Sequence, residues 1–202
     1  AGVITLGSAN NFTGAVSLNN SGTNNVAVTD TNAIILGTSS VGSGTLTITA
    51  TGTITQSGVT TITQAAGAGV ASFTAGANAI TLTNANDFTG AVALSNSGAN
   101  NVAVTDTNAI ILGTSSVGSG TLTITATGTI TQSGATTITQ AASAGTASFT
   151  AGANAVATLR SRNKLGKGKL AAKTTLQIPN ELLRAPFRAS LAGKSIIPSR
   201  RL

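Results

Sequence analysis

Side chains able to do acid–base, metal or nucleophilic chemistry are few in this 202-residue chain. The sequence has no His and no Cys, which rules out a standard zinc site, a Ser–His or Cys–His nucleophile and a disulfide. Its four carboxylates are Asp30, Asp87, Asp106 and Glu181. We therefore predict a non-catalytic protein that has no catalytic, cofactor-binding or metal-binding residues and no cofactor.

Two of the carboxylates occupy equivalent positions in a repeated motif. Asp30 and Asp106 each stand in the sequence VTDTNAI, and their numbers differ by 106 − 30 = 76. Calcium-binding rolls use a glycine–aspartate nonapeptide instead, and two aspartates several coils apart are too distant to share an ion. We predict that each aspartate accepts hydrogen bonds from nearby backbone amides in a turn.

The basic residues are confined to one end of the chain. All eleven Lys and Arg lie from Arg160 onward, so residues 1–156 carry three Asp and a net charge of −3, while residues 157–202 carry 11 − 1 = +10. Electrostatics predicts a polyanion contact through the first basic cluster, which consists of Arg160, Arg162, Lys164, Lys167, Lys169 and Lys173. Phe187 is the only aromatic residue of this tail, so base stacking is poorly supported and no specific nucleic acid is expected.

Threonine rows form another candidate site. The pattern Thr-x-Thr occurs at Thr45-Leu46-Thr47, and such arrays on a flat solenoid face can match the spacing of water in ice. The intervals between the strands are uneven, however, and Thr is favoured in any exposed strand. Asn pairs such as Asn10-Asn11 and Asn24-Asn25 suggest carbohydrate binding, although their Gly and Ser neighbours favour turns or Asn ladders between coils.

The Asp, Thr and Asn residues discussed above lie within an internal sequence repeat. Shifting the sequence by 76 superimposes it on itself, and residues 24–58 match 100–134 without a change. We place the repeats at about 4–79 and 80–155, within a repeat region that spans 1–156. A third copy begins at Gly152 and stops after Val156, where the composition changes.

Alternation with period two predicts β-strands throughout this region. In TLTITATGTITQSG, Thr occupies one parity and mostly aliphatic residues the other, so that one face is apolar and the other carries hydroxyls. Small aliphatics and only two Phe per unit favour a parallel β-solenoid (β-helix) over a pair of β-sandwich domains, which remains the alternative. With about 19–25 residues per coil and strands about 4.8 Å apart, each unit would hold three or four coils.

Several phrases resemble the repeats of a known family. ANDFTGAVAL, TLTITATGTITQSG and ASFTAGANAITLTNAN resemble the repeats of large bacterial surface adhesins of the filamentous haemagglutinin type. The resemblance implies a right-handed parallel β-helix, export across the outer membrane, and a role as a stalk or adhesive filament. It transfers no functional residue, and the chain departs from the family because it has about two units, no secretion domain and a basic tail.

The tail and the location of the protein are less well specified by the sequence. We predict that residues 157–202 are disordered, or a frameshifted continuation of the repeat. No apolar run approaches the roughly 18 residues needed to span a bilayer. The first residues lack the basic region of a signal peptide, so for an extracellular or cell-surface protein the export signal would lie outside this chain.

These observations lead to one functional hypothesis and two alternatives. We expect a non-catalytic structural or adhesive β-solenoid segment of a secreted bacterial surface protein. Its partners would be glycans or proteins of host or neighbouring cells, together with other copies of itself through open coil edges. The alternatives are an ice- or carbohydrate-binding solenoid that uses Thr or Asn rows, and a basic-tail binder of nucleic acid or anionic membrane.

Overall fold

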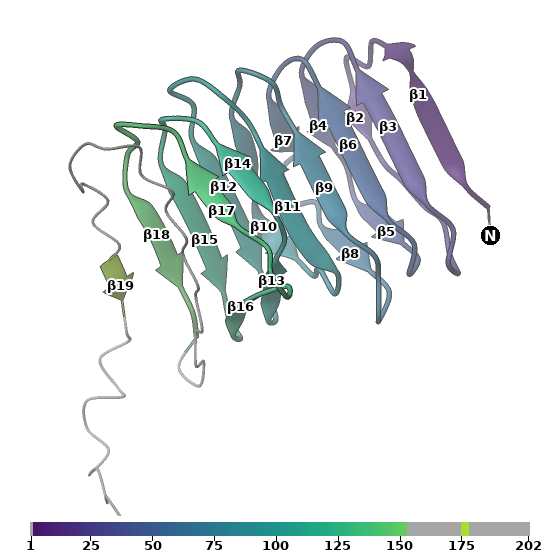
Figure 1. The fold of residues 1–202 in the computed structure, drawn as a ribbon. Helices are drawn as coiled ribbons and strands as arrows, with labels where there is room; N and C mark the ends of the chain where they lie inside the picture. The colour runs from purple at the N-terminus through teal and green to yellow at the C-terminus, as the bar shows by residue number, and fades with distance from the viewer. Residues whose placement is uncertain (1, 153–174, 178–202) are drawn as a thin grey trace, which may run out of the picture.

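The chain folds as a β-solenoid (Figure 1). The computed structural model describes residues 2–152 and 175–177. Within them, a nine-stranded sheet, here sheet 1, consists of β1 (Ile4–Asn10), β3 (Val26–Asp30), β6 (Leu46–Ala50), β9 (Ala71–Thr74), β11 (Ala91–Ser95), β13 (Ile110–Leu112), β14 (Ser115–Val117), β16 (Ile130–Gln132) and β17 (Ile138–Gln140). An eight-stranded sheet, here sheet 2, consists of β2 (Ala15–Val16), β4 (Ile34–Leu36), β7 (Ile54–Gln56), β10 (Ile80–Asn86), β12 (Val102–Asp106), β15 (Leu122–Ala126), β18 (Ala147–Thr150) and β19 (Thr175–Gln177). The strands β5 (Ser39–Val41) and β8 (Ile62–Gln64) pair separately.

Every strand pair in the described residues is parallel, so the chain returns to the same flank after each coil. In sheet 1, Val26 pairs with Leu46 and Leu46 pairs with Ala71, so one coil advances the residue numbering by 20 and the next by 25. The longest coil within the two repeats runs from Ile54 to its partner Ile80 and advances the numbering by 26. The solenoid prediction is confirmed, with about seven turns in total.

Equivalent strands of the two repeats lie on opposite sheets. β3 and β12 share the sequence VAVTD, yet β3 belongs to sheet 1 and β12 to sheet 2. The identical strands β6 and β15 are exchanged in the same way. Because two repeats make about seven turns, each repeat spans 7/2 = 3.5 coils, and the odd half-coil rotates each copy to the other side.

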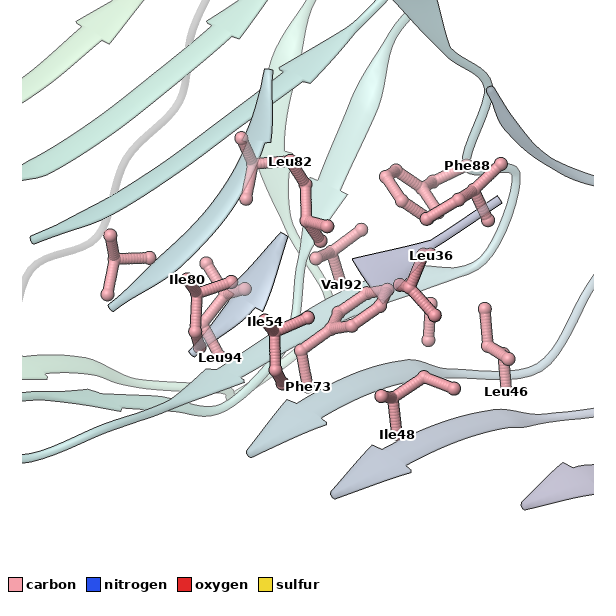
Figure 2. Close-up of a cluster of buried hydrophobic side chains, with 14 of the residues drawn as sticks. Leu36, Leu46, Ile48, Ile54, Phe73, Ile80, Leu82, Phe88, Val92 and Leu94 are labelled. Atoms are coloured by element: carbon pink, nitrogen blue, oxygen red, sulfur yellow. The ribbon is translucent and has the colours of Figure 1, made fainter. Parts of the chain in front are cut away.

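The core is a narrow stack of apolar side chains between the two flanks. In sheet 1, Val28, Ile48, Phe73 and Leu94 are neighbours in successive coils, and each is at most 2% exposed. Figure 2 shows Ile48, Phe73 and Leu94 in the interior with Phe88, whose ring meets Phe73 edge to face at 5.8 Å. The interior is thus filled mainly by aliphatic groups, as the alternating sequence indicates.

Glycine is required at the corners where consecutive coils touch. A Cβ on Gly120 would lie 2.1 Å from the carbonyl oxygen of Asn100 in the preceding coil. The equivalent Gly44 approaches the carbonyl oxygen of Asn24 in the same manner, at 2.3 Å. Since these contacts are with backbone atoms, any larger residue would force two coils apart, which explains the Gly-Ser-Gly corners of the sequence.

Another turn provides a matched pair for a stability prediction. Gly67 has φ of 70°, and its equivalent in the second repeat is Ser143 with φ of 58°, in the left-handed region that disfavours side chains. We expect Ser143→Gly to raise the free energy of unfolding by up to about 1 kcal/mol, because relief of strain exceeds the entropy cost of glycine. Chemical denaturation would measure this change.

The reverse substitution is the control. Gly67→Ser should destabilise the protein by a similar amount, because a Cβ at this position meets nothing within 4 Å and only the backbone conformation matters. If Ser143→Gly lowered the free energy of unfolding, or Gly67→Ser raised it, the left-handed conformation would not be the source of the effect.

The tail is mostly outside the described residues. Only residues 175–177 of the segment 157–202 are described, and they form β19 beside β18. The six basic residues of the proposed polyanion contact, Arg160, Arg162, Lys164, Lys167, Lys169 and Lys173, all lie outside the described residues. Among the described residues, no helix is long and apolar enough to cross a membrane.

Candidate functional site

A row of hydroxyl groups runs along the outer surface of sheet 1. Its members follow one another in the strand register of six consecutive coils and are half-buried or exposed: Thr29, Thr49, Thr74, Ser95, Ser116 and Thr139. At the parallel-strand spacing of about 4.8 Å, the row extends for about 24 Å. It offers a regular ladder of hydrogen-bond donors and acceptors without any charge.

The hydroxyl row combines positions that are not equivalent in the repeat. Thr49 and Thr125 are equivalent, but Thr49 lies in sheet 1 and Thr125 in sheet 2. In sheet 2 the comparable described row contains Thr105, Thr125 and Thr150. The pairing of β12 with the preceding strand β10 has a register shift between Leu82 and Asn86. The half-coil rotation therefore arranges the hydroxyls, and sequence periodicity alone could not reveal it.

The Thr-x-Thr motifs do not form one array. Thr47 and Thr49 lie on sheet 1, and their neighbours in the adjoining coils are Ala27 with Thr29 and Ser72 with Thr74. The second copy, Thr123 and Thr125, lies on sheet 2. Complete Thr-x-Thr pairs consequently do not recur on successive coils of either flank.

The two repeated aspartates are buried and bind backbone amides, as predicted. The Asp106 Oδ1 accepts a hydrogen bond from the Asn108 amide at 2.7 Å, and its Oδ2 accepts one from the Phe88 amide at 2.8 Å. Asp30 repeats this arrangement with the amides of Asn32 and Phe12, at 3.3 and 3.2 Å. One bond closes the local turn and the other reaches the preceding coil, so each carboxylate joins two coils.

Burial raises the pKa of Asp106 above its ordinary value of 3.8. The amides of Phe88 and Asn108 act in the opposite direction, and the charge of Asp87 adds to the increase. The folded protein therefore binds this proton more tightly than the unfolded chain does.

This shift predicts a pH dependence of stability. Because the pKa of Asp106 is higher in the folded state, its favourable contribution is complete below about 3.8 and is lost as the pH rises through the folded value. We expect the free energy of unfolding to contain a component that falls over this acidic range. Urea titrations at several pH values should show this component in the wild type and not in Asp106→Asn; parallel curves for the two proteins would contradict it.

Buried asparagines also connect the coils. The Asn96 amide nitrogen donates to the carbonyl oxygens of Asn78 and Asn100, both at 3.0 Å, and its oxygen accepts from the Gly118 amide at 3.0 Å. Asn20, at the equivalent position, likewise accepts from the Gly42 amide, at 2.9 Å. These asparagines satisfy backbone groups at the corners and are structural, which agrees with the prediction of turns and contacts between coils.

The described residues form no cluster of metal-ligating side chains. Among residues 2–152 and 175–177, no three His, Cys, Asp or Glu side chains come together to hold a metal ion. A shallow hollow of about 290 Å³ lies at a corner near Ser97, Ser116 and Thr139, and its lining contains no titratable side chain. The side chains that line this hollow can therefore offer only neutral hydrogen bonds and apolar contacts.

Comparison with known proteins identifies the repeat. No curated protein and no solved structure matches the chain. A family described as repeats of unknown function, DUF5649, matches residues 23–95 and again residues 99–176, so the second match continues past the composition change at residue 156. Together the two matches cover three quarters of the chain, which therefore belongs to the DUF5649 family of repeats.

Proposed function

We propose that the chain is a non-catalytic structural and adhesive segment of a secreted bacterial surface protein. The observation that carries this proposal is the continuous stack of about seven coils, joined by parallel hydrogen-bond ladders through both repeats. Such a stack resists extension along its axis because many backbone bonds act together. The resemblance of its repeat phrases to filamentous haemagglutinin-like adhesins supports the location at the cell surface.

The lateral surface is suited to contacts with glycans or proteins. The only charged side chains within residues 2–152 are three aspartates, of which Asp30 and Asp106 are fully buried. The hydroxyl row of sheet 1 would thus meet a partner through many neutral hydrogen bonds, each of which is weak, with avidity from repetition.

An adhesion assay tests the proposal. Beads coated with the folded full chain should bind bacterial or epithelial cells more strongly than beads coated with the heat-denatured chain. The control is a variant in which all eleven basic residues of the tail are replaced by Gln, because it separates adhesion by the solenoid from adhesion by charge. Binding that disappears in this variant would favour the basic-tail alternative, and binding equal to that of denatured chain would contradict the proposal.

Carbohydrate binding by the solenoid is the second candidate, and the six-coil hydroxyl row favours it. A glycan array probed with the wild type and with Thr74→Ala/Ser95→Ala would test it, since these changes interrupt the middle of the row. Signals that the double variant retains in full would exclude the row as the binding surface. The exchange of Thr-x-Thr motifs between sheets argues against the ice-binding alternative.

A further inference from the structure

The hydroxyl row of sheet 1 takes no part in holding the solenoid together. Its central members lie in consecutive coils, each with a described strand on both sides: Thr49, Thr74, Ser95 and Ser116. Their side-chain hydroxyls make no hydrogen bond with any described residue. These oxygens are also not buried, because the only buried side-chain nitrogen or oxygen without a partner in the described part of the chain is the Oδ1 of Asn32. The row is therefore free to bind an external partner.

Hydroxyls at the turns behave differently. The Thr31 Oγ1 donates to the Asn10 carbonyl oxygen at 2.7 Å, and the equivalent Thr107 Oγ1 donates to the Asn86 carbonyl oxygen at 2.8 Å. These bonds join consecutive coils and recur in both repeats. On the strands, the carbonyl oxygens are occupied by the parallel ladder, which leaves the hydroxyls of the row without a partner in the fold. Bonds between coils thus account for the turn hydroxyls and not for the row.

An apolar column lies beside the hydroxyl row on the same face of sheet 1. Ala91 pairs with Ile111, and Val70 lies next to Ala91 because the residues that follow them, Ala71 and Val92, are paired. Val70 is 43% exposed, and Ala91 and Ile111 are half-buried. In the coils of β9 and β11 this column lies four residues before the row, which corresponds to about 13 Å. A ligand on this face can thus meet hydroxyls along one edge and apolar groups along the other.

Charge is absent from the described part of this face. Of the three aspartates in residues 2–152, Asp30 and Asp106 are fully buried, and Asp87 lies in the connection between β10 and β11. A carboxylate or sulfate group on a ligand would find no cation here, and an ammonium group would find no anion. The face is therefore matched to a neutral ligand.

We propose that sheet 1 binds a neutral, extended, β-linked linear polysaccharide that lies parallel to the solenoid axis between the hydroxyl row and the apolar column, with one sugar on each coil. This inference rests on the carbohydrate-binding candidate for the function and adds the class of glycan and its direction. Successive coils are about 4.8 Å apart, and the sugars of an extended β-1,4-linked chain advance by a similar length. Because a hydroxyl both donates and accepts, each member of the row can pair with a sugar hydroxyl.

The two edges of the site also fit the two kinds of surface on such a chain. Each sugar carries hydroxyls along its edges, which face the row, and C–H groups on its faces, which pack toward the apolar column. Successive sugars are turned over, but each has hydroxyls on both edges, so the register with the coils is kept. An α-1,4-linked glucose chain curls into a helix instead, and it loses this register after a few coils.

A length series tests the class and the direction of the ligand. The probes are linear β-1,4-linked glucose oligomers from the disaccharide to the hexasaccharide, the simplest members of the class, and the controls are α-1,4-linked oligomers of the same lengths. Calorimetry with the full chain should show an affinity that rises at least about tenfold along the β series, because each added sugar reaches another coil. The α series should rise less than about threefold. An equal rise in both series, or no rise in the β series, overturns the proposal.

Matched variants locate the site on one sheet. Thr49→Val/Thr74→Val removes two neighbouring hydroxyls and keeps the branched shape, so it should weaken binding of the β-linked hexasaccharide at least about fivefold. The control Thr125→Val/Thr150→Val changes the equivalent neighbours, which the half-coil places on sheet 2, and should change the affinity less than about twofold. Circular dichroism checks that both variants fold. Equal losses of affinity in the two variants would overturn the assignment to sheet 1.

The apolar column is tested by a natural difference between the repeats. The equivalent of Val70 is Thr146, which directly precedes β18 of sheet 2. Val70→Thr replaces a methyl group by a hydroxyl and should weaken hexasaccharide binding about two- to threefold, whereas Thr146→Val should leave it unchanged. An unchanged affinity for Val70→Thr would overturn the placement of the glycan beside the column.

The outcomes separate this inference from the proposed adhesive function. If coated beads adhere to cells and the β-linked series does not bind, the inference fails and adhesion through another ligand, such as a protein, remains. If the series binds with the expected dependence on length and the beads do not adhere, the inference holds and the adhesive function fails. Affinity for the hexasaccharide should change less than about twofold between about 0.05 and 0.5 M salt; a fall of about tenfold would show that the charged tail binds it, which overturns the proposal.

Discussion

Replacing Phe73 by alanine is expected to lower the free energy of unfolding by about 3–5 kcal/mol. The side chain is fully buried between Ile48 and Leu94 of the adjoining coils, and its ring meets Phe88 edge to face at 5.8 Å and 72°. The stacked backbones cannot close around the space that is left, because their separation is fixed by the hydrogen-bond ladder. Urea denaturation followed by circular dichroism would measure the loss.

The second repeat offers a matched control for this prediction. Phe149 is equivalent to Phe73, but it lies in the last described coil of the two repeats and is 7% exposed. Phe149→Ala should cost less, about 2–3 kcal/mol, because the side chain of Phe149 is less completely buried than that of Phe73. Equal losses for the two variants would contradict a core in which the cost of truncation follows the burial of each side chain.

The second large effect is expected from Asp106→Ala. This change leaves the amides of Phe88 and Asn108 without acceptors inside the solenoid, and each such loss costs about 1–3 kcal/mol. We expect a total loss of about 2–6 kcal/mol, to be measured by the same urea titration. The carboxylate links two coils, so the loss should affect cooperative unfolding rather than one turn alone.

Two variants separate the causes of this effect. Asp106→Asn keeps one acceptor oxygen, so it should lie between the wild type and Asp106→Ala. Asp30→Ala should cost less than Asp106→Ala, because the hydrogen bonds of Asp30 are longer, at 3.2 and 3.3 Å, and its amide partner Phe12 is only half-buried. A loss for Asp30→Ala that exceeds the loss for Asp106→Ala would contradict this assignment.

The sequence carries the information for the strands and the coil length. Alternation of Thr with aliphatic residues predicts β6 and β15 correctly, because one face must be buried and the other solvated. Within the two repeats, the coils advance the numbering by 20 to 26, so the estimate of about 19–25 made from the sequence is exceeded by one residue in the coil from Ile54 to Ile80. The turn role of Asp30 and Asp106 is also confirmed, since a buried carboxylate flanked by turn residues needs local donors.

The half-coil could not be predicted from the repeat. The repeat period fits three coils or four, and only the pairing of strands decides that equivalent residues alternate between the flanks. The hydroxyl row depends on this pairing, because Thr49, Thr74 and Ser95 become neighbours through coils of unequal length. β19 is likewise set by pairing: Thr175, Leu176 and Gln177 carry little local signal, and β18 provides the edge that they complete.

The continuity of the coils through both repeats is tested most directly by one intramolecular disulfide. Thr74 ends the first repeat on sheet 1, and its neighbour across the ladder, Ser95, belongs to the second repeat. The solenoid predicts that Thr74→Cys/Ser95→Cys forms this bond rapidly in the folded monomer, while Thr74→Cys/Thr150→Cys, which joins equivalent positions on opposite sheets, stays reduced. A reduced first pair, or an oxidised second pair, would contradict a single solenoid in which each repeat turns three and a half times.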